Sequence, residues 1–331
     1  MVMAQALFKL LRKQDPDRAL DVLAPAWSLS VVARMPEIRR GISAETAHGE
    51  LGLAKRWRIA RSLQGERYDN AIVLPRSFKS ALIPWLARIP KRTGFRGESR
   101  FGLINDVRAF DRTVLDQTVK RFTALGVGNG EALPAVLYPE LSIDAERQAE
   151  LLDTLSLDTQ YPVVAMMPGA EYGSAKCWPL DHFAELATRL EAAGYRTWVM
   201  GSDKDAAAGQ AIVERSSAVN LCGRTSLADV IDVLGLAEQA VSNDSGLMHI
   251  AAAVGLHVHG VYGSSSPTFT PPLTDRCDVH YLGLPCSPCF ERECPLGHLK
   301  CLRDLKPAAV LDRVRRASAR SDAFGEHTPK A

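Results

Sequence analysis

Ser242-Asn-Asp-Ser-Gly-Leu-Met-His-Ile-Ala-Ala-Ala-Val-Gly255 is the stretch of sequence that decides the fold. The residues before it, 239–241, indicate the end of a buried strand, and the chain then turns through Asp244-Ser-Gly246 into a short amphipathic helix. Such a turn aims backbone N–H groups and the positive end of a helix dipole above the strand, and Gly246 lets a ligand approach the backbone closely. The stretch predicts either a pyrophosphate site or an ordinary helix cap made by the Asp or the Ser of the turn.

A second segment, Val163-Val-Ala-Met-Met-Pro-Gly-Ala-Glu-Tyr-Gly-Ser-Ala-Lys-Cys-Trp-Pro179, repeats the order of strand, loop and helix. We expect its helix to begin near Pro179, because proline is tolerated in the first turn of a helix. Lys176 lies in the loop with no apolar pattern around it, so its ammonium group is either a solvated surface charge or a point charge for a phosphate. Two such turns in one domain favour a diphosphate site.

Strand-like and helix-like segments alternate along the chain, which predicts α/β layers with parallel sheets. In a doubly wound sheet, ligands bind at the carboxyl ends of the strands. Lys176, Thr225 and Asp244 each follow a predicted strand, so we expect them to converge on one crevice. The predicted strands are 19–23, 71–74, 163–167, 196–200, 219–221, 239–242 and 258–262, and the predicted helices are 1–13, 56–63, 141–155, 180–193, 205–216, 227–236, 247–254 and 307–316.

Length and composition limit the class of protein. The 331 residues suffice for two domains, and 46% apolar with 24% charged residues is typical of a soluble globular protein. No stretch approaches the roughly 18 apolar residues of a membrane-spanning helix, and the N-terminus lacks the basic and apolar regions of a signal peptide. Seven cysteines are an odd number and do not match a secreted disulfide pattern. We therefore expect a cytoplasmic location.

The net charge of +2 hides a basic segment. Residues 51–100 contain twelve Lys or Arg against three acids, which favours an anionic partner, although part of this excess is expected to be a solvated surface. We expect no nucleic-acid partner, because the segment lacks the interleaved aromatic residues of single-strand binding and the spacing of a helix-turn-helix or zinc finger.

Several separated motifs resemble those of one enzyme family, the lipopolysaccharide heptosyltransferases of glycosyltransferase family 9. The motifs similar to its donor-binding segments are Pro168–Pro179, Asn243–His249 and Tyr262–Pro267. Those similar to the members that add the second heptose are Phe78–Ala81, Arg92–Gly97 and Leu103–Asp106. The resemblance runs over nearly the whole chain.

The resemblance implies a GT-B fold, in which two Rossmann-like domains face each other across a cleft whose closure excludes water. It implies an acceptor domain over residues 1–155, a donor domain over 156–306, and a C-terminal helix and tail over 307–331 that crosses back to the first domain. The implied reaction is an inverting transfer of L-glycero-D-manno-heptose from ADP-heptose to heptose I of the lipopolysaccharide inner core. The resemblance implies that no metal or other cofactor is required for this transfer. The implied acceptor is heptosyl-Kdo2-lipid A, reached peripherally at the cytoplasmic surface of the inner membrane.

The resemblance also implies roles for individual residues. Lys176 and Asp244 are the expected catalytic residues, with Asp244 accepting hydrogen bonds from heptose hydroxyls or capping the helix. His249 is either a ligand contact or a packed core histidine. The expected donor-binding residues are Gly169, Ala170, Glu171, Tyr172, Lys176, Thr225, Asp244, Ser245, Gly246 and His249. The expected acceptor-binding residues are Ser77, Lys79, Arg92 and Arg96, with Lys91 and Arg100 as further candidates, because arginine binds phosphate and carboxylate oxygens in pairs.

The start of the chain leaves alternatives open. The resemblance implies a first strand and a Gly-rich loop ending in an Asp, the family's proposed general base, whereas this chain begins at the helix that follows them. One alternative is that the start of the chain is misassigned, in which case the expected Asp would precede Met1. Otherwise the chain is a catalytically impaired nucleotide-sugar-binding module. A sugar-nucleotide epimerase of similar fold is a third reading, against which the basic segment argues.

Four cysteines form a cluster with the spacing Cys286-x2-Cys289-x4-Cys294-x6-Cys301. Four thiols within sixteen residues, separated by Pro and Gly turns, could hold a zinc ion or an iron–sulfur cluster. The spacing does not match a standard zinc finger, and the resemblance implies no metal for transfer. A structural metal is one of two readings here, and four free thiols are the other.

Overall fold

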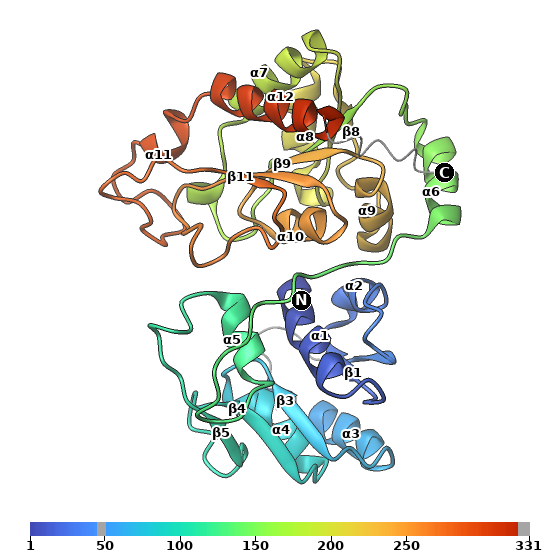
Figure 1. The fold of residues 1–331 in the computed structure, drawn as a ribbon, viewed down its shortest axis with the longest axis vertical. Helices are drawn as coiled ribbons and strands as arrows, with labels where there is room; N and C mark the ends of the chain where they lie inside the picture. Colours follow the sequence, from blue (N-terminus) through green and yellow to red (C-terminus); the bar gives the residue numbers. More distant parts are fainter. Residues whose placement is uncertain (45–50, 324–331) are drawn as a thin grey trace. The chain divides into compact units, whose positions relative to one another are not determined.

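The computed structural model of the protein describes residues 1–44 and 51–323, and these form two compact units. The N-terminal unit runs to Tyr138, and the C-terminal unit begins at Pro139 (Figure 1). Every sheet in the described residues is parallel, which confirms the predicted α/β class. Within the same residues, no helix is long and apolar enough to cross a bilayer.

A six-stranded parallel sheet forms the centre of the C-terminal unit, in the order β11-β10-β9-β6-β7-β8. The predicted strands of this half are confirmed to within a residue or two. Their bounds are β6 (Val163–Met167), β7 (Arg196–Val199), β8 (Val219–Asn220), β9 (Gln239–Asn243) and β10 (His257–Val261). The sequence analysis missed β11 (Cys277–His280), because its polar edge-strand residues have no apolar run.

The strand order places a switch point between β6 and β9. The chain adds β7 and β8 on one side of β6 and then returns to add β9 and β10 on the other side. All residues of β6 and of β9 are buried, and each fully buried apolar side chain contributes roughly 1.5–3 kcal/mol to folding. The loops that follow these two strands therefore start from a rigid base at the place where such sheets bind ligands.

Helices cover the faces of this sheet (Figure 1). Trp178 and Phe183 are fully buried and belong to the core beneath α7 and α12. The bounds are α6 (Ala145–Leu155), α7 (Leu180–Ala192), α8 (Ala206–Val213), α9 (Leu227–Leu234), α10 (Gly246–Ala253), α11 (Lys300–Arg303) and α12 (Pro307–Ala323). Single 3₁₀ turns are Ser174–Lys176 and Asp203–Asp205.

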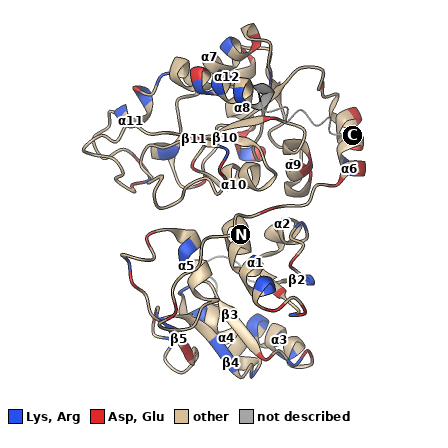
Figure 2. Cartoon of the chain, viewed as in Figure 1, with Lys and Arg blue, Asp and Glu red and all other residues tan. Residues whose placement is uncertain are grey.

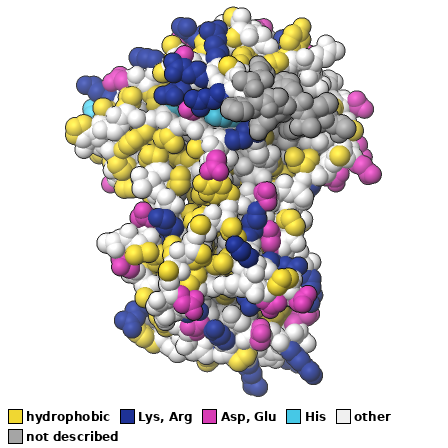
Figure 3. Space-filling model, viewed as in Figure 1, with side chains coloured by type: hydrophobic (Ala, Val, Ile, Leu, Met, Phe, Trp, Pro, Cys, Tyr) yellow, Lys and Arg dark blue, Asp and Glu magenta, His cyan; other side chains and the backbone are white. Residues whose placement is uncertain are grey.

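The domain boundary lies earlier than the expected residue 155. Helix α6 belongs to the C-terminal unit because it packs on α9, where Arg147 pairs with Asp229 at 2.8 Å. The contacts of the last helix place it within the C-terminal unit. Helix α12 packs on α7 and β10 of its own unit and buries Val310 and Val314 there. Figure 3 shows Lys and Arg gathered where α12 lies. Arg315 is one of the exposed basic residues of this helix.

The N-terminal unit contains two separate parallel sheets, of two and three strands. The strands are β1 (Asp21–Ala24) with β2 (Arg40–Ser43), and β3 (Asn70–Val73) with β4 (Lys91–Phe95) and β5 (Asp106–Arg108). The helices are α1 (Gln5–Gln14), α2 (Leu29–Val32), α3 (Leu53–Gln64), α4 (Phe78–Leu86) and α5 (Thr118–Ala124), with 3₁₀ turns at Val2–Ala4 and Ala26–Ser28. Figure 2 shows the basic residues spread over α3, α4 and β4.

Candidate functional site

An ion pair joins the two loops at the switch point of the C-terminal sheet. Lys176 Nζ lies 2.6 Å from Asp244 Oδ2, and the side chains are only 19% and 5% exposed. Thr270 Oγ1 donates a second hydrogen bond to Asp244 Oδ2 at 3.2 Å. The predicted convergence of Lys176 and Asp244 is therefore present. The lysine is not a free point charge here, because it is held by a nearly buried carboxylate.

Asn243, the last residue of β9, ties the loop after β6 to the end of β9. Its Nδ2 donates to the Pro168 carbonyl at 2.6 Å, and its Oδ1 accepts from the Trp178 backbone N–H at 3.0 Å. Asn243 is fully buried, so both bonds form away from competing water. Sequence reasoning did not assign it a role. The available signal was an amide residue at the end of a buried strand, directly before the Asp244 turn.

The N-terminus of α10 is open beside this pair. Ser245 precedes the helix without making a side-chain capping hydrogen bond, and the Asp244 carboxylate is bonded to Lys176 and Thr270. The alternative of an ordinary helix cap is therefore not what the structure has. A Cβ atom at Gly246 would meet no atom within 4 Å, so this glycine leaves free space above the helix end. An anion placed there would face unpaired N–H groups and the helix dipole.

The rest of the loop after β6 surrounds Lys176. The ammonium group lies 5.2 Å from the centre of the Tyr172 ring, and the Tyr172 hydroxyl donates to the Phe290 carbonyl at 2.7 Å. Gly169 is held close to Asp205, since a Cβ would meet that carboxylate at 2.4 Å. Ala170, the next residue after Gly169, is half-buried. These contacts fix the path of the loop and the position of the lysine.

Two other predicted donor residues lie apart from the ion pair. Glu171 is mostly exposed and pairs with Lys204 at 3.1 Å on the neighbouring loop. Thr225 follows β8, two strands from β6, and no contact in the described structure joins it to Lys176 or Asp244. Its Oγ1 is nonetheless buried without a hydrogen-bond partner there. Neither residue makes a hydrogen bond or an ion pair with Lys176 or Asp244 in the described structure.

Two serines after β10 add buried hydroxyl groups at the same edge of the sheet. Ser264 and Ser265 are 1% and 4% exposed, and both Oγ atoms lack a hydrogen-bond partner in the described structure. Strand β10 is the neighbour of β9, so these hydroxyls follow the next strand along. Unpaired buried polar atoms are rare, which makes them candidates for contact with a polar ligand.

Comparison with known proteins identifies the family of this chain. The sequence profile of Glycosyltransferase family 9 (heptosyltransferase) matches residues 56–300, well over half of the chain. The chain belongs to glycosyltransferase family 9. It is therefore a glycosyltransferase.

Several relatives of this family 9 enzyme that align over most of its length are named heptosyltransferase 2. The chain is 39% identical over 326 residues to lipopolysaccharide heptosyltransferase 2 of Salmonella typhimurium, covering 95% of this chain and 94% of the relative. It is 40% identical over 294 residues to lipooligosaccharide heptosyltransferase 2 of Haemophilus influenzae, with 84% of each chain covered. The solved structure of E. coli ADP-heptose lps heptosyltransferase II matches with a TM-score of 0.86 and 37% identity, over 97% of this chain and 96% of that one. The match confirms the GT-B class.

His249 of the family 9 enzyme lies one turn into α10 and is half-buried. Burial lowers the pKa of its imidazole to about 4, although the nearby Asp244 carboxylate acts in the opposite direction. The ring is therefore neutral near pH 7. Its Nδ1 is buried and has no hydrogen-bond partner among the described residues. Both readings, a ligand contact and a packed histidine, remain consistent with this position.

The expected acceptor residues fall into two groups at opposite ends of the three-stranded sheet. Ser77 follows β3 and Arg96 follows β4, so both lie at carboxyl ends of neighbouring strands. Ser77 makes no capping hydrogen bond to α4, and Arg96 is exposed, with its guanidinium 5.9 Å from the Phe101 ring. Lys79 lies half-buried in the first turn of α4, next to Ser77. These three side chains stay candidates for an anionic ligand.

Two of the remaining basic candidates, Arg92 and Arg100, are used inside the fold, and Lys91 makes a surface ion pair. Arg92, near the start of β4, donates to the backbone carbonyls of Ile89, Pro90, Gly102 and Leu103. Lys91 pairs with Asp106 at 3.5 Å. Arg100 is 4% exposed and donates to two carbonyls, of Pro75 and Phe95. Burial and the nearby Arg76 lower the pKa of Arg100. The structure therefore argues against acceptor roles for Arg92 and Arg100, whereas Lys91, whose side chain is 54% exposed, stays a candidate.

Proposed function

We propose that this enzyme transfers L-glycero-D-manno-heptose from ADP-heptose to the first heptose of the lipopolysaccharide inner core, with inversion at the transferred carbon. The relatives' names support the donor and the acceptor. The observation that carries the proposal is the Lys176–Asp244 pair beside the open N-terminus of α10. This arrangement offers positive charge and unpaired N–H groups at one point, as a diphosphate requires.

Lys176 and the start of α10 would stabilise the leaving group. When the bond between heptose and diphosphate breaks, negative charge develops on the departing ADP. A preorganised ammonium group and helix N–H donors stabilise that charge without a metal ion. No cofactor enters this chemistry, since the donor already carries the activated sugar.

Asp244 would hold the sugar and orient the lysine. A carboxylate repels a phosphate, so its direct ligand is better assigned as the heptose hydroxyl groups, which donate hydrogen bonds to it. Its bond to Lys176 keeps the ammonium group in place before the donor arrives. Gly169, Ala170, Tyr172, Ser245 and Gly246 complete the proposed donor site, with Ser264 and Ser265 as additions from the structure.

The N-terminal unit would bind the lipid-linked acceptor. Ser77, Lys79 and Arg96 at the carboxyl ends of β3 and β4 are the proposed contacts for its phosphate or carboxylate groups. A lipid-linked acceptor implies action at a membrane surface, which we propose is the cytoplasmic face of the inner membrane. The exposed arginines of α12 suit such an anionic surface.

The proposal is tested with the full chain, ADP-heptose and two lipid acceptors, Kdo2-lipid A with and without its first heptose. We expect ADP release and a mass increase of one heptose only with the heptosylated acceptor. Transfer to the acceptor without heptose would overturn the acceptor assignment. Binding of ADP-heptose without turnover on either acceptor would favour the binding module, and a changed sugar nucleotide without acceptor would favour an epimerase.

A further inference from the structure

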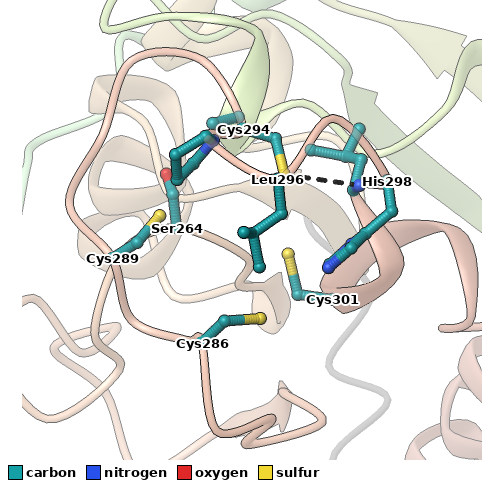
Figure 4. A pocket seen from close by; sticks show the side chains of 10 residues that line it. Ser264, Cys286, Cys289, Cys294, Leu296, His298 and Cys301 are labelled. Carbon is teal, nitrogen blue, oxygen red and sulfur yellow. Dashed lines mark hydrogen bonds between the residues drawn. The ribbon is translucent and has the colours of Figure 1, made fainter.

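Four cysteines and a histidine between β11 and α12 surround one small cavity (Figure 4). All four thiols are free, and no step of the proposed transfer uses them. The cavity measures about 20 Å³, which is room for one water-sized occupant. It is lined by Ala175, Ser264, Cys286, Cys289, Cys294, Pro295, Leu296, His298, Leu299 and Cys301.

The backbone that follows Cys294 places an N–H group against its sulfur atom, where it would stabilise a thiolate. The Gly297 N–H donates to the Cys294 carbonyl at 3.0 Å, and this turn needs the left-handed φ of +67° that Gly297 adopts. The turn brings the Leu299 N–H to 3.4 Å from Cys294 Sγ, the bond drawn in Figure 4. Backbone N–H donors of this kind orient and stabilise the thiolate ligands of metal ions.

A different cluster, of histidines and an aspartate, has another explanation. His257, His259 and Asp278 are the one set in the described chain whose donor atoms all lie within 4.8 Å of one another. His257 Nε2 is already 2.8 Å from the Asp278 carboxylate, and His259 Nε2 is 2.8 Å from Gln239 Oε1. Arg313 lies 3.7 Å from the same carboxylate and would repel a cation. This set is a satisfied hydrogen-bond network.

We propose that one thiophilic divalent cation, zinc or ferrous iron, is bound by the thiolates of Cys286, Cys289, Cys294 and Cys301. Thiolate sulfur is the preferred ligand of both ions, and four such ligands make a closed structural site. Binding forms four metal–sulfur bonds and releases the four thiol protons to solvent. No three of the sulfur atoms lie within 4.8 Å of one another, so rotation of the side chains draws them inward around the cation.

The site would brace the loop that carries Lys176. Ala175 lines the cavity, and its N–H donates to the Arg292 carbonyl at 3.0 Å. Phe290 N–H donates to the Ser264 carbonyl at 2.7 Å, and the Tyr172 hydroxyl donates to the Phe290 carbonyl. A cation that fixes the cysteine segment therefore fixes one wall of the donor site. Its role is structural, and it takes no part in the transfer.

Metal content of the full chain tests the proposal directly. The protein is purified without oxygen or chelators from cells supplied with zinc and iron, and both metals are measured by mass spectrometry. We expect about one equivalent of one of the two. Cys286→Ser and Cys289→Ser should each lose most of it. Cys277→Ser, at a free thiol outside the cavity, should keep it. Wild type that holds neither metal, or a Cys286→Ser variant that keeps it, overturns the proposal.

Cobalt(II) provides a second measurement that does not depend on folding of the variants. Chelator-treated wild type is titrated with cobalt under anaerobic conditions. We expect an intense thiolate-to-cobalt charge-transfer band that saturates at about one equivalent, and slower trypsin cleavage after Arg292 and Lys300. A folded chain that gives no such band overturns the proposal, as does a native disulfide between any two of the four cysteines. Neither result affects the assignment of the heptosyl transfer.

Discussion

Lys176 Nζ and Asp244 Oδ2 lie 2.6 Å apart although the two residues are 68 positions apart in the sequence. The pair is mostly buried, so removing the lysine leaves an uncompensated carboxylate beside the proposed diphosphate site. We predict that Lys176→Ala weakens ADP binding by roughly 30- to 100-fold, about 2–3 kcal/mol, as measured by calorimetry.

The double variant Lys176→Ala/Asp244→Asn should recover part of that loss, since the unpaired charge is gone. Lys204→Ala is the matched control, because Lys204 pairs with Glu171 where both side chains are mostly exposed. Its ADP affinity should stay within about threefold of wild type. Undiminished ADP binding by folded Lys176→Ala would refute the role given to the pair.

Gly246→Ala should separate stability from donor binding. The added methyl group meets no protein atom, and alanine favours a helix over glycine by roughly 0.5–1 kcal/mol, so thermal unfolding should not occur at a lower temperature. The same methyl group takes the space above the start of α10, and donor affinity should fall at least about tenfold. Unchanged affinity would mean that the donor does not approach this turn.

Gly255→Ala is the matched control at the other end of α10. Gly255 has a left-handed φ of +86°, which costs a residue with a side chain about 1 kcal/mol. This variant should lose stability while donor affinity is unchanged.

Arg92 and Arg96 should respond differently to substitution. Arg92→Lys removes hydrogen bonds to backbone carbonyls and should lower the free energy of unfolding by roughly 1–3 kcal/mol, with the KM for the acceptor unchanged. Arg96→Ala should leave the unfolding curve unchanged and raise the acceptor KM about tenfold. Urea unfolding measures the stability of both variants, and steady-state kinetics measure their KM for the acceptor. A raised acceptor KM in Arg92→Lys but not in Arg96→Ala would reverse the roles given to the two arginines.

Asp21 should make stability depend on pH in the acid range. Burial acts to raise its pKa, but hydrogen bonds from Arg39, Tyr68 and Arg40 outweigh burial and hold the pKa at about 2. The unfolded pKa is about 3.9, so the ionised group stabilises the fold fully above about pH 4, and this is lost as the pH falls through 2. The contribution is roughly 2 kcal/mol.

Urea unfolding of Asp21→Asn between pH 3 and 7 measures this contribution. The variant should be less stable than wild type near pH 6, and the difference should shrink below pH 4. Asp17→Asn, at an exposed position of the preceding turn, should unfold like wild type throughout. A gap between Asp21→Asn and wild type that is constant with pH would contradict the titration of Asp21.

Sequence reasoning found the elements whose apolar residues are consecutive. β6 and β9 are entirely buried and contain short apolar runs, which predicted them. Lys176 lies in the loop after β6, and Asp244 comes directly after β9. β4 and β5 were missed because their residues are largely polar or charged, and their pairing depends on neighbours far along the chain.

One cause explains where the expected roles of side chains differ from their contacts in the structure. Arg92 and Arg100 looked like ligand contacts because their charge is visible in the sequence, whereas the carbonyls that they bind are visible only in the fold. Asn243 was missed for the same reason, since its partners at Pro168 and Trp178 come from another strand–loop segment. Packing of α12 on its own unit likewise depends on α7 and β10.

The contact between Gly173 and Arg292 has a consequence for redesign. A Cβ at position 173 would lie 2.3 Å from the Arg292 carbonyl oxygen, so the two backbones touch with no side chain to absorb a change in either. Anyone who grafts a foreign nucleotide-binding segment onto this scaffold must transplant residues near 173 and near 292 as one cassette. Swapping either part alone would leave a mismatch that side-chain repacking cannot repair.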